Sequence, residues 1–303
     1  MKLVTFKTAD GRTAPGALRD DLATIVDLGG VFSSMLDLID SGDEGLARAR
    51  ALAATPDAPT LALADVTLLS PIPTPRRLRD CSVFEEHVQG VAHWARTNGI
   101  GLLAEVPKVW YQHPIYYKGN HLSVVGPEAD IPWPGDVKMF DYELEIACVI
   151  GRRGKNIPTE SAFDHVFGFM IFNDFSIRDV AGMELPGLFG PAKAKDFDGG
   201  NALGPWLVTK DEIPNPYNLV MTASLNGEIM GVANTTRMHH RWDAIVSYAS
   251  AYGETLVPGE VIGSGTAGGG TLVEKGRKLA IGDVVEFSID GLGTLRNRIV
   301  AGA

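Results

Sequence analysis

The sequence contains little cysteine, little positive charge and no long apolar run. Its two cysteines, Cys81 and Cys148, provide neither a disulfide framework nor a cluster of zinc ligands, which fits a reducing compartment. The 27 Lys and Arg residues are outnumbered by 37 Asp and Glu residues, the net charge is −10, and no basic run exceeds two residues. Because an acidic chain repels phosphate backbones, we expect no nucleic-acid partner.

The apolar segments are also too short to cross a membrane. The most apolar of them, residues 61–69 and 166–172, fall far below the roughly 20 residues that span a bilayer. The first residues, MKLVTFKTADGRT, lack the basic and apolar stretches of a secretory signal. We therefore expect a cytoplasmic protein without membrane contacts.

Turn-forming residues are abundant and separate short strand-like runs. Glycine (35) and proline (18) occur throughout the sequence. Asn226-Gly227 after a strand-like run predicts a hairpin, and residues 85–96 fit either a helix or a mobile segment. Strands are predicted at residues 2–7, 141–150, 166–172, 206–209, 219–225 and 283–289, and helical spacing at residues 33–61 and 242–252. Together these patterns predict a β-dominated α+β fold.

One segment marks a domain boundary. Residues 70–75, SPIPTP, place proline at every second position, which favours an extended linker. We therefore expect a small N-terminal domain over residues 1–70 and a second, β-rich domain over residues 75–303.

Acidic residues alternate along the strand predicted at residues 141–150. Alternation places Asp141, Glu143 and Glu145 on one face, with the two glutamates close enough to share one cation. Asp174, at the end of the next apolar run, is a geometrically sensible third ligand. Carboxylate oxygens favour Mg²⁺, Mn²⁺ or Ca²⁺. The alternative is that these glutamates form a solvated polar face without any metal.

Four motifs then resemble those of the fumarylacetoacetate hydrolase family, in the same order and spacing. Similarity extends from about Arg79 to the C-terminus, and the first 70 residues resemble the small N-terminal domain of many bacterial members. The motifs are DYELEIACVIG at 141–151, FNDFSIRD at 172–179, KDFDGGNALGPW at 195–206 and GLGTLRN at 291–297.

The resemblance implies a mixed β-roll that usually dimerises and a metal-dependent enzyme. Its substrate would be a 2-oxo acid with a second oxygen function, such as an acylpyruvate, a fumarylpyruvate-type compound or another product of aromatic ring cleavage. By position, Glu143, Glu145 and Asp174 would bind Mg²⁺, or Mn²⁺ or Ca²⁺, and Lys195 would lie beside the substrate. The cation and Lys195 would stabilise an enolate. Without the motif, Lys195 would be interpreted as an exposed charge.

The glycine-rich stretch at residues 263–270 is interpreted as a substrate loop. By the same resemblance Thr266 would hold a substrate carboxylate or oxo group, with backbone N–H groups such as that of Gly265 around it. A phosphate cradle is the rival interpretation, but the stretch lacks the Gly-Lys-Ser/Thr ending of a P-loop.

His87 matches the position of a histidine that many members carry on a mobile lid, where it would act as the base that activates water. The glutamate that orients it in several members would stand three residues later, where this chain has Gly90. The remaining candidates for the acid that orients the histidine are Glu85, Glu86 and an acid from another loop.

Two other positions affect the substrate assignment. Ala181 stands near a position where hydrolytic members carry a substrate-binding glutamine. In residues 116–126, Lys118 stands where some members have histidine, so that Lys118 and His121 either line the pocket or belong to a turn beneath it.

The motifs therefore predict hydrolysis of the carbon–carbon bond of an acylpyruvate-type 2-oxo acid by a metal-dependent homodimer. An isomerase or an oxaloacetate-type decarboxylase, which would use the same enolate, is the nearest alternative. A non-catalytic protein that binds a metal or a small acid is the rival from another class.

Overall fold

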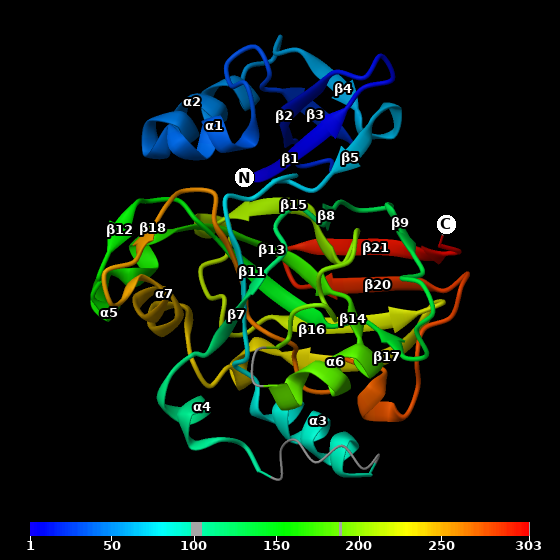
Figure 1. Cartoon of the computed structure of the whole chain (residues 1–303). Helices are drawn as coiled ribbons and strands as arrows, with labels where there is room; N and C mark the ends of the chain where they lie inside the picture. Colours follow the sequence, from blue (N-terminus) through cyan, green and yellow to red (C-terminus); the bar gives the residue numbers. More distant parts are fainter. Residues whose placement is uncertain (98–104, 188–189, 303) are drawn as a thin grey trace.

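The computed structural model describes residues 1–97, 105–187 and 190–302, and its strands and helices form a strand-dominated α+β fold (Figure 1). Within these ranges the largest sheet has the strand order β4-β3-β2-β1-β15-β13-β11-β19-β6-β7, with β5 on β1 and β8 on β15. The strands are β1 (Lys2–Lys7), β2 (Thr13–Leu18), β3 (Thr24–Asp27), β4 (Thr60–Ala62), β5 (Thr67–Leu69), β6 (Leu78–Cys81), β7 (Tyr116–Gly119), β8 (Val124–Val125), β11 (Leu144–Ile150), β13 (Val166–Asp174), β15 (Asn201–Thr209) and β19 (Val261–Gly263).

A second sheet, in the order β17-β16-β20-β21-β9, packs beside the first. The predicted hairpin is confirmed, because Asn226 and Gly227, with φ of 53° and 82°, form the turn between β16 and β17. The sheet contains β9 (Asp130–Pro132), β16 (Val220–Leu225), β17 (Glu228–Asn234), β20 (Val284–Ile289) and β21 (Gly293–Val300), and two strand pairs join β10 (Phe140–Asp141) to β14 (Ser176–Ile177) and β12 (Gly154–Lys155) to β18 (Thr255–Leu256).

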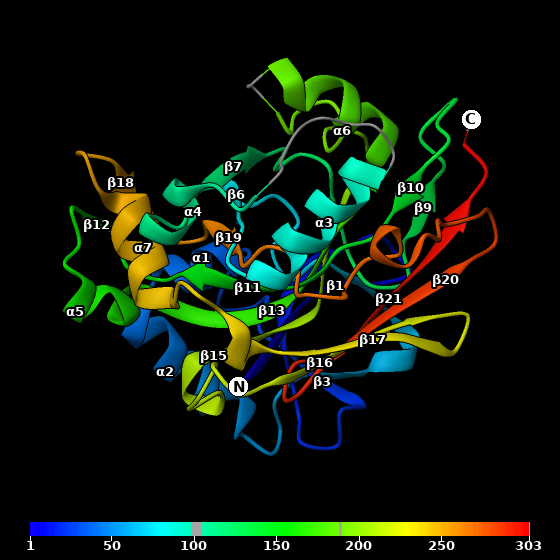
Figure 2. The same ribbon diagram turned by 90° about the horizontal axis from the view of Figure 1, so that it is seen from below.

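The helices are short and lie around the sheets. The segment predicted as a helix or a mobile loop is the helix α3, on the side of the molecule away from α1 and α2 (Figures 1 and 2). In the described part of the chain, no helix is long and apolar enough to cross a membrane. The helices are α1 (Met35–Asp40), α2 (Gly42–Ala53), α3 (Glu85–Thr97), α4 (Lys108–Gln112), α5 (Thr159–Ala162), α6 (Arg178–Glu184) and α7 (Trp242–Ser250).

The N-terminal segment is joined to the rest by the main sheet. Antiparallel pairing of β1 with β15 sets Lys2 opposite Val208 and Leu3 opposite Leu207, so the strands of residues 1–69 extend the central sheet. Residues 70–75 lead from β5 to β6. The division into two domains at this linker stays a prediction.

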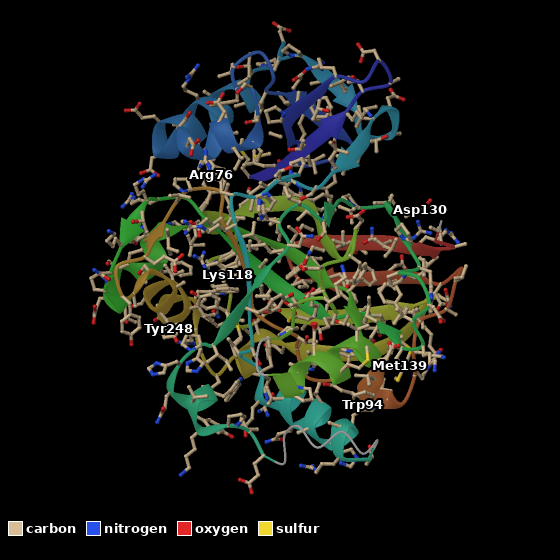
Figure 3. All side chains as sticks on the ribbon, viewed as in Figure 1. Arg76, Trp94, Lys118, Asp130, Met139 and Tyr248 are labelled. Carbon is tan, nitrogen blue, oxygen red and sulfur yellow. The ribbon has the colours of Figure 1, made fainter. Side chains whose placement is uncertain are left out.

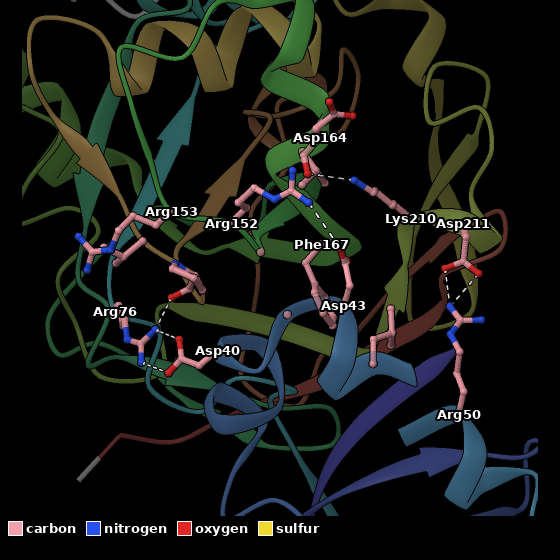
Figure 4. Close-up of a pocket in the computed structure, with 16 residues that line it drawn as sticks. Asp40, Asp43, Arg50, Arg76, Arg152, Arg153, Asp164, Phe167, Lys210 and Asp211 are labelled. Atoms are coloured by element: carbon pink, nitrogen blue, oxygen red, sulfur yellow. Dashed lines mark hydrogen bonds and ion pairs between the residues drawn. The ribbon is translucent and has the colours of Figure 1, made fainter. Parts of the chain in front are cut away.

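A cavity of about 1020 Å³ lies between α1–α2 and the main body of the protein (Figure 4). Ion pairs cross it, including two pairs in which Arg76 binds Asp40 and Arg50 binds Asp211. These cations and acids largely neutralise one another. The cavity is lined by none of the residues that the sequence predicts to be functional.

The two central strands are buried along their whole length. Every residue of β11 and β13 is buried, because each strand is hydrogen-bonded on both sides and covered on both faces. The alternative in which Glu143 and Glu145 form a solvated face is therefore wrong: the two side chains are buried, with exposures of 5% and 0%.

Candidate metal centre and active site

Four carboxylates meet where neighbouring interior strands of the main sheet begin or end. Strands β6 and β19 run parallel, with Asp80 opposite Gly263, and β11 runs antiparallel to β19. The ends of β6, β19 and β13 therefore lie beside the beginning of β11 (Figure 2). One oxygen from each acid lies within 4.8 Å of the others in the buried acidic cluster formed by Asp80, Glu143, Glu145 and Asp174.

Asp80 is the member of this cluster that sequence reasoning missed. It lies in the short strand β6, within the sequence LRDC, where nothing in the local pattern distinguishes it from a surface acid. Only the long-range pairing of β6 with β19 brings it to the cluster. Its Oδ1 accepts a hydrogen bond from Gly265 N–H at 3.0 Å.

The cluster contains acids whose pKa values are shifted in opposite directions. Burial and the charge of Asp174 raise the pKa of Asp80, and burial and Asp80 raise the pKa of Glu145, in both cases well above the usual carboxyl range. Burial alone would also raise the pKa of Glu143, but Lys195 and Arg178 outweigh it and hold that pKa well below its usual value.

These residues fit a hard divalent cation. Asp174 Oδ1 is buried and has no hydrogen-bond partner among the described residues, so this oxygen is available to a cation. Glycine at position 263 keeps the space open, since a Cβ there would lie 2.4 Å from Asp80 Oδ1 and 2.8 Å from Glu145 Oε2. An all-carboxylate donor set could hold Mg²⁺, Mn²⁺ or Ca²⁺.

The predicted residue Lys195 lies inside the cluster. Its ammonium is buried and contacts Glu143 Oε2 at 2.6 Å and Asp174 Oδ2 at 2.5 Å. Burial disfavours the charged ammonium, but Asp174 and Glu143 outweigh this effect and raise the pKa of Lys195, so the side chain carries a positive charge at neutral pH. The interpretation as an exposed surface charge is therefore wrong.

Strand alternation separates Lys118 from the cluster. The hydroxyl of Tyr117, the preceding residue on β7, donates to Asp174 Oδ2 at 2.6 Å, so the side chain of Lys118 takes the opposite face. Lys118 is exposed and lines a different cavity with His121 and Arg76; it lies between Arg76 and Tyr248 in Figure 3. The structure thus brings Tyr117, and not Lys118, to the acids.

The substrate loop predicted around Gly265 follows β19 and lies against the cluster. The N–H of Gly265 donates to Asp80 Oδ1 and to Glu145 Oε2, both at 3.0 Å, and Thr266 Oγ1 donates to Glu145 Oε1 at 3.5 Å. Gly265 has φ of +79°, and a Cβ would lie 2.3 Å from the carbonyl oxygen of Cys81. Both residues are placed at the carboxylates, while their contact with substrate stays a prediction.

His87 faces the cluster from α3 and is held by an acid from another loop. Its Nδ1 lies 2.8 Å from Glu274 Oε1, and its Nε2 lies 3.8 Å from Glu143 Oε1. Because a carboxylate only accepts hydrogen bonds, Glu274 favours the tautomer with the proton on Nδ1, which leaves Nε2 free as a base.

The contact between Glu274 and His87 requires glycine at position 90. A Cβ at position 90 would lie 2.9 Å from Glu274 Oε1 and 3.0 Å from its Cγ, so any larger residue would displace the acid. The two candidate substitutes on α3 are engaged elsewhere: Glu85 accepts from Gln89 and Tyr111, and Glu86 accepts from Arg237. The orienting acid is therefore Glu274, which the sequence could indicate only as an acid from another loop.

Removing the carboxylate of Glu274 is expected to slow turnover without unfolding the protein. Glu274→Gln retains the size of the side chain but removes its charge, so turnover should fall by roughly tenfold to a hundredfold, as for other residues that orient a functional group. Steady-state kinetics measures the loss. Glu85→Gln, which changes an acid of α3 that binds Gln89 and Tyr111 instead of His87, is the matched control, and an equal loss in both variants would contradict the specific role of Glu274.

Comparisons with known proteins place this chain in a family. A family model described as "Fumarylacetoacetate (FAA) hydrolase C-terminal" matches residues 80–300. The chain belongs to the fumarylacetoacetate hydrolase family. This confirms the family to which its motifs point, and the strand-dominated α+β fold agrees with it.

Related members have more than one activity. The chain is 34% identical over 309 residues to the mitochondrial oxaloacetate tautomerase fahd2 of Xenopus laevis, covering 99% of this chain and 90% of that protein. It is also 34% identical over 244 residues to the maleylpyruvate hydrolase of Aquipseudomonas alcaligenes, covering 79% and 77%. A solved structure of the fumarylacetoacetate hydrolase of Exiguobacterium antarcticum has a TM-score of 0.80 at 27% identity and 99% coverage of both chains. Members of this family are therefore enzymes, and their names include tautomerase and hydrolase.

Proposed function

We propose that this protein is a divalent-metal-dependent hydrolase that cleaves the carbon–carbon bond of an acylpyruvate-type 2-oxo acid. The observation that carries the proposal is the pair His87 and Glu274 beside four buried carboxylates. A cluster of carboxylates alone would suit a cation-binding protein, whereas a histidine with its free Nε2 toward the same cluster adds a base. Asp80, Glu143, Glu145 and Asp174 would hold Mg²⁺ or Mn²⁺, which would supply positive charge for an enolate.

The protein's own residues account for the proton transfers. His87 Nε2 takes a proton from water, and the oxygen of that water bonds to the acyl carbonyl carbon. The bond between this carbonyl carbon and the neighbouring CH₂ carbon then breaks, and the proton held by His87 is transferred to the CH₂ carbon, which becomes the methyl group of pyruvate. The products are a carboxylic acid and pyruvate. Lys195 contributes a fixed positive charge beside the developing enolate, and Tyr117 is in position to orient Asp174.

Keto–enol tautomerisation of oxaloacetate is a second candidate function. Its support is the 34% identity with the oxaloacetate tautomerase over 99% of this chain. The same base would move a proton between carbon and oxygen, with no attack by water. Ala181 in α6, whose methyl group offers no hydrogen bond, favours this simpler reaction over hydrolysis.

A single assay separates the two functions. The enzyme with Mn²⁺ is incubated with a series of acylpyruvates, including fumarylpyruvate and maleylpyruvate, and with oxaloacetate, and products are followed by proton NMR. We expect pyruvate and the matching acid in equal amounts from at least one acylpyruvate. Rapid interconversion of oxaloacetate tautomers with no cleavage of any acylpyruvate would replace hydrolase by tautomerase.

A further inference from the structure

Asp141 is a buried carboxylate outside the acidic cluster, and it binds two different parts of the site. It lies at the end of β10, with 1% of its surface exposed. Its Oδ1 accepts from Tyr142 N–H and Leu272 N–H, both at 2.9 Å. Its Oδ2 accepts from Arg178 Nε at 2.8 Å and from Val273 N–H at 3.3 Å.

One arm of this network leads to the acidic cluster. Arg178 is buried, and while its Nε is held by Asp141, its Nη1 contacts Glu143 Oε1 at 2.7 Å. A guanidinium donates along fixed directions, so fixing Nε also fixes the direction of Nη1. The position of the Glu143 carboxylate therefore depends on Asp141 through Arg178.

The other arm leads to His87. The two N–H groups that Asp141 binds, at residues 272 and 273, directly precede Glu274 in a 3₁₀ turn (Val273–Lys275). Glu274 in turn contacts His87 Nδ1 at 2.8 Å. Because two backbone groups adjacent to Glu274 are fixed by one carboxylate, Asp141 sets the place from which Glu274 reaches the histidine.

We propose that Asp141 is a positioning residue that sets the cluster acid Glu143 and the base His87 relative to each other. It touches neither the reacting atoms nor the cation, and it acts through Arg178 on one side and through the Glu274 turn on the other. The proposal rests on the proposed function for its kinetic consequence, but the geometry it describes exists without turnover.

Asp141→Asn tests the proposal, because an amide cannot replace the carboxylate at both ends. The NH₂ group faces either Arg178 and Val273 or Tyr142 and Leu272, and leaves the N–H groups there without an acceptor. We expect kcat to fall at least tenfold with KM changed less than threefold. We also expect the proton signal of His87 Nδ1–H in the metal-free protein to be lost or shifted, because the Glu274 contact is weakened.

A second variant tests one arm alone. Arg178→Lys keeps the positive charge but cannot donate to Asp141 and Glu143 with the same geometry. Mn²⁺ affinity, measured by calorimetry, should weaken about tenfold, while the His87 Nδ1–H signal stays in place because Asp141 still holds residues 272 and 273. Asp141→Asn should change both readouts.

The control and the double variant decide between positioning and general destabilisation. Glu260→Gln removes another buried carboxylate, bonded to Arg79 and to Val257 N–H, and should lower thermal stability without changing the His87 signal.

The double variant tests whether Asp141 acts through Glu274. In Asp141→Asn combined with Glu274→Gln, kcat should fall by less than the product of the two single losses. Multiplicative losses in kcat, or an unchanged His87 signal in Asp141→Asn, would overturn the proposal. If the wild type cleaves no acylpyruvate, the signal and Mn²⁺ measurements still test it.

Discussion

His87→Ala is expected to abolish acylpyruvate cleavage while leaving the protein folded. The imidazole Nε2 lies 3.8 Å from Glu143 of the acidic cluster, and general base catalysis contributes roughly 10²- to 10⁴-fold to rate, so turnover should fall by that factor. Deuterium exchange from solvent at the carbon next to the oxo group should continue, because the cation and Lys195, which would stabilise the enolate, are unchanged in this variant. Product assays and proton NMR measure the two reactions separately.

His93 provides the matched control for this variant. It lies on the same helix and is exposed, so His93→Ala should leave both reactions unchanged. Unchanged hydrolysis in His87→Ala would show that the histidine is not the base. If the variant lost both acylpyruvate cleavage and Mn²⁺ binding, His87 would be a structural residue. Release of carbon dioxide from oxaloacetate by the wild type, with no acylpyruvate cleavage, would instead indicate a decarboxylase.

Removal of the divalent cation, or of one carboxylate that would bind it, is expected to have an equally large effect. A chelator should stop turnover, and Mg²⁺ or Mn²⁺ should restore it. Asp80→Asn should lower turnover at least a hundredfold at the Mn²⁺ concentration that saturates the wild type. The reason is that three carboxylates carry less negative charge than four and therefore bind the cation more weakly.

Thermal unfolding gives a readout of the same prediction that is independent of activity. Mn²⁺ at a hundred times its Kd should raise the free energy of unfolding of the wild type by about 2.7 kcal/mol. The same Mn²⁺ concentration should raise that of Asp80→Asn much less. Without metal, Asp80→Asn should be at least as stable as the wild type, because it relieves a buried cluster of like charges. Asp43→Asn, at a position whose side chain is 95% exposed, is the control and should be stabilised by Mn²⁺ as much as the wild type. Full activity of the wild type without metal would exclude a cation requirement.

Local sequence patterns predicted most of the framework of the fold. Residues 2–7 form β1, residues 242–250 of the segment predicted at 242–252 form α7, and the Asn226-Gly227 turn joins two strands. Such features depend on hydrophobic periodicity and on residues that accept positive φ, which are properties of a few consecutive residues. Residues 85–96 were ambiguous because their apolar stripe is weak, and packing against the rest of the protein resolves them as helix α3.

The sequence by itself determined the family and predicted three of the four clustered carboxylates, because these stand within motifs or local patterns. Its resemblance to that family also predicted Lys195, Gly265, Thr266 and His87 as residues of the same site. Only the tertiary structure decided that Asp80 completes the cluster, that Glu274 orients His87 and that Tyr117 faces the acids in place of Lys118. The physical reason is that each of these contacts depends on which distant strands pair and in which register. A parallel pairing such as that of β6 with β19 is stabilised by the whole sheet and leaves no signal in the few residues around Asp80.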